Sequence, residues 1–364
     1  MGALSDITIV DFSRILAGPY ATMLLADCGA EVIKIEKPLS GDDTRTWGPP
    51  FDSMGVSTYF QSVNRNKSSI TADLTTPEGI QKVRHLLKRA DVVVENFVPG
   101  TMESFGLGYE QLIIECPRLI YVSISGFGNS DKARNLPGYD LLVQAMSGLM
   151  SITGPDSEHP TKAGVALIDV IAGLHAALAV TTAIHHRGRT GEGQKIEINL
   201  MSSALSAMVN QASSFVSAGI NPSAMGNAHP SIAPYEVFRA SDGALIIAVG
   251  NDRQFESLMA TLNIESDNRF TTNSDRVSNR IALVDLLNSR LVEDTIANWV
   301  VRLTRVNVPA GPINSVRQAI ELAESLDLNP IVLLDGIRTV ANPMKFSKTP
   351  VEYRSSPPKL GESD

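Results

Sequence analysis

Apolar and amphipathic segments alternate along the first part of the chain. Residues 7–13 (ITIVDFS) form an apolar run typical of a buried strand. Residues 20–30 carry a helical pattern that follows Pro19, a residue that favours helix starts, and stops at Gly29. The alternation continues with strands expected at 31–38, within 64–74, at 91–97 and at 119–127, and with helices expected at 76–90 and 108–119. This order predicts an α/β domain with helices on both faces of a mostly parallel sheet.

The pattern changes after residue 226. Two apolar segments at 235–240 and 244–250 flank a Ser-Asp-Gly turn, which predicts a β-hairpin. Helical patterns follow at 252–262, 277–291 and 295–306, and a proline-containing segment ends this part at 308–313. We therefore expect a small α+β domain here, followed by one more helix at 314–325.

One carboxylate, Asp169, stands inside the apolar run of residues 165–180. Burying an ionised group is costly unless a partner compensates, and two interpretations are open. Asp169 is either the N-cap of the following helix, accepting hydrogen bonds from the amides of Ile171 and Ala172, or a nucleophile that helix-end amides keep ionised and apolar neighbours shield from water. The two are compatible, because a reactive carboxylate needs both the amides and the burial.

Composition narrows the possible functions. The 364-residue chain has no uninterrupted run of about 18 apolar residues and no basic start, so neither a membrane span nor a secretory signal is expected. Its two cysteines, Cys28 and Cys116, form no disulfide or CxxC pattern, and its six histidines form no metal-binding pattern. The net charge of -8 argues against nucleic-acid binding. We expect a cytoplasmic protein without a bound metal.

Ligands of parallel α/β sheets bind beyond the carboxyl ends of the strands. The GFGNSD segment from residue 126 lacks the third glycine of the dinucleotide motif, and no P-loop or GxSxG motif is present, which disfavours nicotinamide and nucleoside-triphosphate ligands. Four cations follow the early strands instead: Lys37, Arg45, Arg65 and Lys67. They are either solvated surface charges or parts of a phosphate-binding site.

Six segments lie in order along nearly the whole chain: GPYATMLLADCGAEVIKIEKPLSGDDTR (18–45), NRNKSSITADL (64–74), VENFVPGTMESFGLGYEQL (94–112), PGYDLLVQAMSGLM (137–150), the Asp169 run with RGRTGEGQKIEINL (187–200), and GNAHPSIAPYEVF (226–238). Together they resemble the class III CoA-transferase family, which also contains the α-methylacyl-CoA racemases. The resemblance implies a Rossmann-like large domain of residues 1–219 completed by 318–364, an inserted small domain of residues 220–317, and a homodimer of two interlocked, ring-shaped protomers.

The resemblance also implies roles for single residues. Asp169 matches the family's catalytic aspartate, which forms acyl-anhydride and CoA-thioester intermediates, so coenzyme A is expected as a substrate and no further cofactor is expected. Lys37 stands where many members have an arginine against the CoA adenine and phosphate, although lysine lacks the planar guanidinium fork. Asn96 and Gly100 match the segment that contacts the CoA chain. Leu16 stands where some transferases carry a glutamine near the acyl group.

More than one activity is compatible with this family. Racemases need two bases across one carbon, and the position of their catalytic histidine is occupied by Tyr139, a poor base at neutral pH. Glu236 matches a racemase carboxylate that many transferases share. These residues favour a CoA-transferase; an epimerase of the same fold and a CoA-binding protein without catalysis are the alternatives.

The loop of residues 226–233 bears on the substrate. It contains Asn227 and His229, and it resembles branches of the family that act on dicarboxylates. His229 either binds a second carboxylate or packs as a loop residue against Pro230. We expect backbone amides of this loop and of the helix start near Asp169 to hold developing oxyanions. The predicted reaction moves CoA from an acyl-CoA such as succinyl-CoA to a carboxylic acid, most naturally a dicarboxylate.

Overall fold

The computed structural model describes residues 2–364, which form two compact units. The first unit contains the residues up to Leu149, Lys162–Asn221 and Leu328–Asp364, so it is built from both ends of the chain. The second unit contains Met150–Thr161 and Pro222–Asp327. The divisions fall at 221 and 327 rather than at the predicted 219 and 317, and the segment 150–161 joins the second unit.

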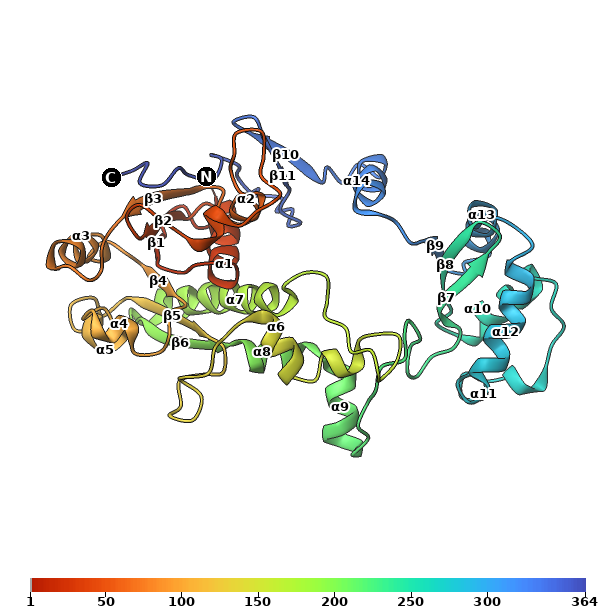
Figure 1. Cartoon of the computed structure of the whole chain (residues 1–364). Helices are drawn as coiled ribbons and strands as arrows, with labels where there is room; N and C mark the ends of the chain where they lie inside the picture. Colours follow the sequence, from red (N-terminus) through yellow and green to blue (C-terminus); the bar gives the residue numbers. More distant parts are fainter. Residues whose placement is uncertain (1) are drawn as a thin grey trace. The chain divides into compact units, whose positions relative to one another are not determined.

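A six-stranded sheet organises the first unit (Figure 1). Its strands are β1 (Thr8–Asp11), β2 (Glu31–Glu36), β3 (Lys67–Thr71), β4 (Val92–Glu95), β5 (Ile120–Ser125) and β6 (Gln194–Asn199). Every neighbouring pair is parallel, in the order β3-β2-β1-β4-β5-β6. This is the Rossmann strand order, which reverses between β1 and β4, and ligands bind at the carboxyl ends of the strands at that point. The predicted parallel α/β fold is confirmed.

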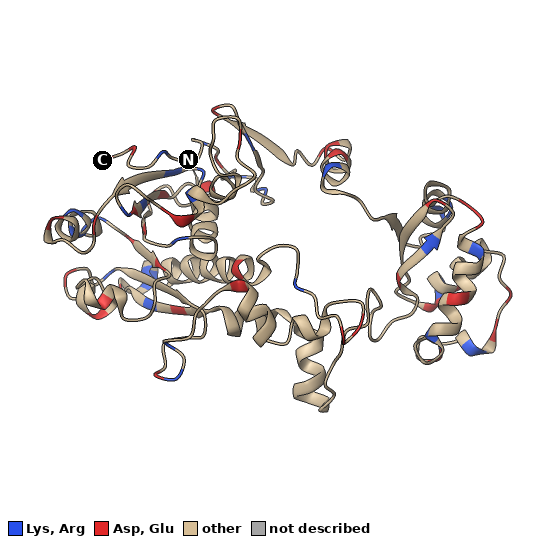
Figure 2. Cartoon of the chain, viewed as in Figure 1, with Lys and Arg blue, Asp and Glu red and all other residues tan. Residues whose placement is uncertain are grey.

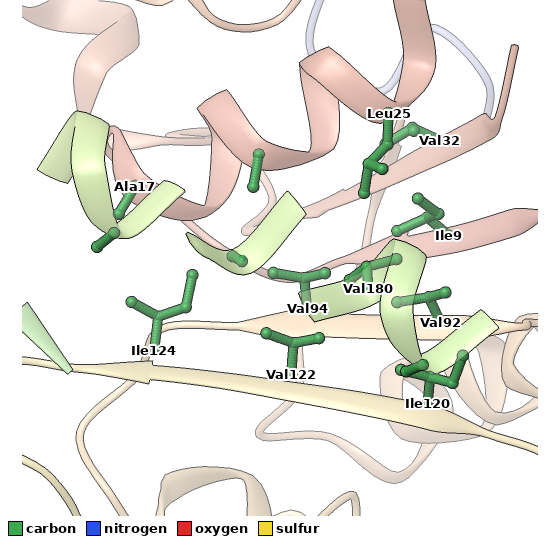
Figure 3. Close-up of a cluster of buried hydrophobic side chains, with 14 of the residues drawn as sticks. Ile9, Ala17, Leu25, Val32, Val92, Val94, Ile120, Val122, Ile124 and Val180 are labelled. Carbon is green, nitrogen blue, oxygen red and sulfur yellow. The ribbon is translucent and has the colours of Figure 1, made fainter. Parts of the chain in front are cut away.

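Helices cover both faces of this sheet. The helices of the first unit are α1 (Ala17–Asp27), α2 (Thr58–Ser62), α3 (Pro77–Leu87), α4 (Thr101–Ser104), α5 (Tyr109–Leu112), α6 (Asp140–Met146), α7 (Leu167–Thr190), α8 (Leu200–Ala207) and α9 (Val209–Ala218), with the 3-10 turn η1 (Asp43–Thr46) and a C-terminal hairpin of β10 (Ile331–Leu334) and β11 (Ile337–Val340). Side chains alternate between the faces along each strand. Val94 therefore packs with Val122 and with Val180 of α7 (Figure 3), whereas Val93 packs on the other face with Val83 of α3.

Helix α7 carries Asp169 and packs against α1. By length and composition alone it could cross a membrane, which the sequence analysis did not anticipate. Core helices of globular proteins pass the same test. Ile168, Ala172 and Ala176 belong to the buried cluster between α7 and the sheet, so one face of α7 packs in the core of the first unit.

Gly173, one turn after Asp169, lets α7 approach α1 closely. A Cβ at this position would lie 2.7 Å from the backbone oxygen of Ala17. We expect Gly173→Ala to force the helices apart and to lower the free energy of unfolding by about 1 to 3 kcal/mol, measured by urea denaturation. The matched control on the same helix is Gly188→Ala, whose Cβ would meet no atom within 4 Å. Equal destabilisation of the two variants would contradict this role of Gly173.

The second unit contains a three-stranded antiparallel sheet in the order β7-β8-β9. Its elements are β7 (Tyr235–Ala240), β8 (Gly243–Ala248), β9 (Ala310–Pro312), η2 (Met150–Ile152), α10 (Asp252–Thr261), η3 (Asn268–Phe270), α11 (Asn273–Ser278), α12 (Arg280–Leu291), α13 (Ile296–Arg305) and α14 (Val316–Ser325). Phe238, Leu245, Leu287 and Trp299 are among the residues of its buried core. The predicted hairpin is confirmed, and the helix expected at 314–325 belongs to this unit.

Candidate active site

Asp169 is the third residue of α7 and does not cap the helix. The N-cap residue is Ala166, which makes no side-chain hydrogen bond. Asp140, in the first turn of α6, accepts hydrogen bonds from the backbone amides of Ile168 at 2.8 Å and of Asp169 at 3.2 Å. The N-cap interpretation of Asp169 was therefore wrong. Because Asp140 occupies these two amides, they are not free to hold an oxyanion as the sequence analysis expected.

The Asp169 side chain is poorly solvated. Within residues 2–364 its carboxylate accepts no hydrogen bond and forms no ion pair. Burial, and then the negative charge of Asp140, raise the pKa of Asp169 to about 7. A carboxyl group near its protonation midpoint at neutral pH is strongly nucleophilic when ionised, and such shifts are typical of functional sites.

Asp169 lines a cavity of about 280 Å³ beyond the carboxyl ends of β4 and β5. Asn96 and Arg134 line the same cavity, and apolar walls come from residues such as Ala17 and Leu200. The cavity lies on the β4 side of the point where the strand order reverses. This is the edge of the sheet at which the sequence predicted a ligand.

Asn96 links two loops at this edge. Its Oδ1 accepts a hydrogen bond from the backbone amide of Arg14 at 2.8 Å, and its Nδ2 donates to the backbone oxygen of Arg14 at 2.7 Å. The guanidinium carbon of Arg14 lies 5.3 Å from the ring centroid of Phe97. The segment after β4 is thereby fastened to the loop after β1, and the structure brings Asn96 and Asp169 to one cavity.

A second cavity, of about 320 Å³, shares Phe97 with the Asp169 cavity. Its lining includes the cations Arg14 and Lys37. Lys34 and Asp42 also line it and form an ion pair at 2.9 Å with fully buried side chains. Lys37 therefore faces a cavity, as its predicted role near a phosphate requires. Arg14 was missed by the sequence analysis, although its position directly after a predicted strand was a usable signal.

The other three predicted cations are held by internal ion pairs. They are Arg45 with Glu36 at 2.6 Å, Arg65 with Asp27 at 2.6 Å, and Lys67 with Asp11 at 3.1 Å. Burial lowers the pKa of Lys67 to about 8, although Asp11 acts in the opposite direction. None of the three lines the Asp169 cavity or the Lys37 cavity. Their positions support a structural role rather than ligand binding, since these pairs are largely buried. Arg14 is also paired, with Asp43 at 3.1 Å, but both side chains of that pair are about half exposed.

Three further predicted residues do not line the cavity that contains Asp169. Leu16 is buried at the N-cap position of α1 and lines neither cavity described above. Gly100 has a φ of 95°, precedes α4 and lines a separate cavity on the other side of the Val98–Pro99 segment. Tyr139 is the N-cap residue of α6 and is 65% exposed.

The remaining predicted residues belong to the second unit. Glu236 forms an ion pair with Arg280 at 2.8 Å, and the same guanidinium donates to the backbone oxygen of His229 at 2.5 Å. The ring of His229 contacts the ring of Tyr235 edge-on. Arg280, which the sequence analysis missed, thus holds the 226–233 loop in shape. The predicted substrate-binding roles of Asn227, His229 and Glu236 stay predictions.

Residues 2–364 contain no group of three or more His, Cys, Asp or Glu side chains able to hold a metal ion. The only polar side-chain atoms in residues 2–364 that are buried without a hydrogen-bond partner are the Tyr121 hydroxyl and the Asn129 Oδ1. Both line the cavity that contains Gly100, which Asp169 does not line.

Comparison with known proteins gives the family. Residues 4–364 match the model of CoA-transferase family III. The chain is 42% identical to succinate–glutarate CoA-transferase of Agrobacterium fabrum, covering 99% of this chain and 93% of that protein, and 40% identical to succinyl-CoA:glutarate CoA-transferase of Mus musculus, covering 100% and 85%. The crystal structure of a CAIB/BAIF family protein from Brucella suis is 43% identical and superimposes with a TM-score of 0.90 over 99% of this chain and 97% of that chain. The chain belongs to CoA-transferase family III.

Proposed function

We propose that this protein transfers coenzyme A from an acyl-CoA to a carboxylic acid, with Asp169 as the nucleophile. The observation that carries the proposal is the poorly solvated Asp169 carboxylate at a cavity on the ligand-binding edge of the sheet. The adjoining cavity, with Lys37 and Arg14, supplies cations for the CoA phosphates. Phe97 lines both cavities, so the two adjoin, and the proposed CoA spans them with its phosphates near Lys37 and its thioester near Asp169.

The chemistry consists of four nucleophilic steps at carbonyl carbons. Ionised Asp169 attacks the donor thioester and expels the CoA thiolate, which forms a mixed anhydride. The thiolate then attacks the aspartyl carbonyl, which releases the donor acid as a carboxylate and leaves an aspartyl-CoA thioester. The acceptor carboxylate attacks this thioester to form a second anhydride, and the thiolate attacks the acceptor carbonyl to give the new acyl-CoA and free Asp169. One thioester replaces another, so the reaction needs neither ATP, a metal nor a cofactor beyond CoA itself.

We propose a dicarboxylate acceptor and a succinyl-CoA-like donor. Support comes from the two relatives whose names specify succinate or succinyl-CoA and glutarate. Against an epimerase, the exposed Tyr139 supplies no second base inside the Asp169 cavity. We test the proposal by incubating the enzyme with succinyl-CoA and a panel of carboxylic acids and measuring acyl-CoA products by mass spectrometry. New acyl-CoA is expected. Deuterium incorporation from heavy water at the α-carbon without transfer would instead identify an epimerase. The absence of both reactions, with CoA still bound, would identify a CoA-binding protein.

The charge of Asp140 should contribute to the pH dependence of this reaction, in addition to burial. Asp140→Asn keeps an oxygen for the amides of α7 and removes the negative charge, so the pKa of Asp169 should fall. Because only ionised Asp169 attacks the thioester, we expect the acidic limb of kcat/KM against pH to shift to lower pH. Asp156→Asn, which removes an exposed carboxylate of the second unit, is the control. An unchanged acidic limb in Asp140→Asn would contradict the electrostatic coupling.

We also propose that the protein works as an interlocked homodimer in the cytoplasm. Large apolar side chains are exposed on α7 and around α9, among them Leu174, Leu178, Phe215, Val216 and Ile220. Figure 2 shows α9 without any charged residue. An exposed apolar face of this kind is typical of a surface that a partner covers. Light scattering coupled to gel filtration should give twice the 39.1 kDa mass of the chain, whereas the mass of a single chain would contradict the dimer.

A further inference from the structure

We propose that Arg134 forms a carboxylate subsite in the Asp169 cavity and binds the distal carboxylate of a dicarboxylate substrate. This inference rests on the proposed function. Among the described residues, Arg134 is the one cationic side chain that lines the cavity with Asp169. Lys37 and Arg14 line the neighbouring cavity, where we place the CoA phosphates.

The guanidinium of Arg134 is free to bind a ligand. In the described chain it donates no hydrogen bond, and its ion pair is to Asp131 at 3.8 Å, with the Asp131 side chain fully exposed. An exposed pair at this distance contributes little. Arg65 differs, since its Nε and Nη2 both donate to the buried carboxylate of Asp27. Arg134 therefore keeps a planar set of donors that matches a carboxylate in a bidentate geometry.

The loop that carries Arg134 is closed at its base. Gly126 and Gly138 approach so closely that a Cβ on Gly126 would lie 2.3 Å from the Cα of Gly138. Within the loop, the backbone amide of Arg134 donates to the oxygen of Ser130 at 2.9 Å. The guanidinium lies against Gly100, where its Nη2 would be 3.0 Å from an added Cβ. This internally bonded loop thus holds the Arg134 side chain where the Asp169 cavity and the Gly100 cavity adjoin, since Val98, Pro99 and Arg134 line both.

Charge balance explains why a cation is needed there. Asp169 and Asp140 make this end of the cavity negative, which opposes the entry of an anionic substrate. A dicarboxylate adds a second negative charge that does not react and must lose part of its hydration inside the cavity. Arg134 offsets that cost for an acid with a distal carboxylate and offers nothing to a monocarboxylate. The subsite therefore selects dicarboxylates through their unreactive end.

Arg134 has an alternative role, which is to neutralise the acidic side chains of a second cavity. Arg134 also lines the adjoining cavity that contains Glu95 and Glu103. If Arg134 served only to neutralise these acids, its loss would affect all substrates alike and lower stability. Comparing how the variant binds a dicarboxylate and a monocarboxylate of equal chain length distinguishes carboxylate binding from neutralisation of Glu95 and Glu103.

The test compares Arg134→Gln with Lys132→Gln. Lys132 is an exposed cation of the same loop and lines none of the cavities described above, so its variant controls for net charge and loop composition. KM and kcat are measured for glutarate and for pentanoate, which lacks the distal carboxylate, at a saturating acyl-CoA concentration. Dissociation constants of both acids and of CoA are measured in parallel by calorimetry, because binding does not depend on turnover.

We expect Arg134→Gln to raise KM and the dissociation constant for glutarate at least about 10-fold, with kcat, pentanoate binding and CoA binding nearly unchanged. Lys132→Gln should behave as wild type, and Arg134→Lys should recover part of the glutarate affinity. Equal losses for glutarate and pentanoate, a loss of CoA affinity alone, or unchanged glutarate binding would overturn the subsite. Absence of transfer to any acid in the wild type would refute the proposed function, and calorimetry would still decide whether Arg134 binds the dicarboxylate.

Discussion

Asp169→Ala is expected to lower turnover by at least about 10³-fold, because Asp169 is the one carboxylate among the described residues that line the cavity and the proposed intermediates need a carboxylate. The acyl group and CoA must both pass through the aspartyl carbonyl in the proposed chemistry. CoA binding should stay near the wild-type value, since the cations near the phosphates are untouched. Initial rates of acyl-CoA formation and a CoA titration measure the two quantities.

The same variant is expected to be more stable than wild type at alkaline pH. Burial and the charge of Asp140 raise the pKa of Asp169 from its ordinary value of 3.8 to about 7, so the folded protein holds this proton more tightly than the unfolded chain does. The ionised side chain therefore costs stability progressively as pH rises from about 4 through 7, and the cost is complete above 7. Asp169→Ala should raise Tm at pH 8 and change it little at pH 4. Retained turnover, or a lower Tm at pH 8, would contradict this account of Asp169.

Asp27→Ala is expected to lower the free energy of unfolding by about 3 to 5 kcal/mol. Asp27 is fully buried and accepts hydrogen bonds from Arg65 at 2.6 and 2.9 Å, from Asn66 at 2.8 Å and from Asn342 at 2.9 Å. Removing the carboxylate leaves the buried guanidinium of Arg65 without its counter-ion. Asp27 also ties α1 to the C-terminal segment of the first unit, so the effect should extend to the whole unit.

Urea denaturation followed by circular dichroism measures this loss. The control is Glu31→Ala, which removes a pair with Arg89 at 3.6 Å in which both side chains are more than half exposed. That pair should contribute less than about 1 kcal/mol. Similar losses in the two variants would contradict the structural role of the buried pair, and so would a selective loss of CoA binding in a stable Asp27→Ala protein.

The sheet was predictable from sequence because its signals are local. Strands β1, β2, β4 and β5 are short apolar segments with helical segments after them, and such patterns are read within a window of about 11 to 18 residues. Parallel strands then bring their carboxyl ends to one edge, so Asn96 could be placed beside the ligand site before any contact was known. Asp169 could be singled out because it is a charged residue in an apolar run.

The electrostatics of the site was not predictable, because it depends on partners distant in sequence. Nothing near Asp140 indicates that it accepts the first amides of α7, a contact that occupies the capping position. The pKa of Asp169 is raised by burial and then by the charge of Asp140, and both depend on the folded structure. Arg65 and Lys67 look like surface charges or phosphate ligands in the sequence NRNK, yet their counter-ions come from α1 and β1. Whether a cation is free or neutralised is decided by tertiary contacts, and Arg134 was overlooked for the same reason.

The most direct test of the account is the mass of the peptide that contains Asp169 after brief reaction with succinyl-CoA in the absence of an acceptor. We predict a covalent CoA thioester on this peptide that borohydride reduces to a homoserine side chain at position 169, and no such change in Asp169→Ala. An enzyme that transfers CoA while position 169 stays unmodified, or that carries the label on another residue, would contradict the central claim.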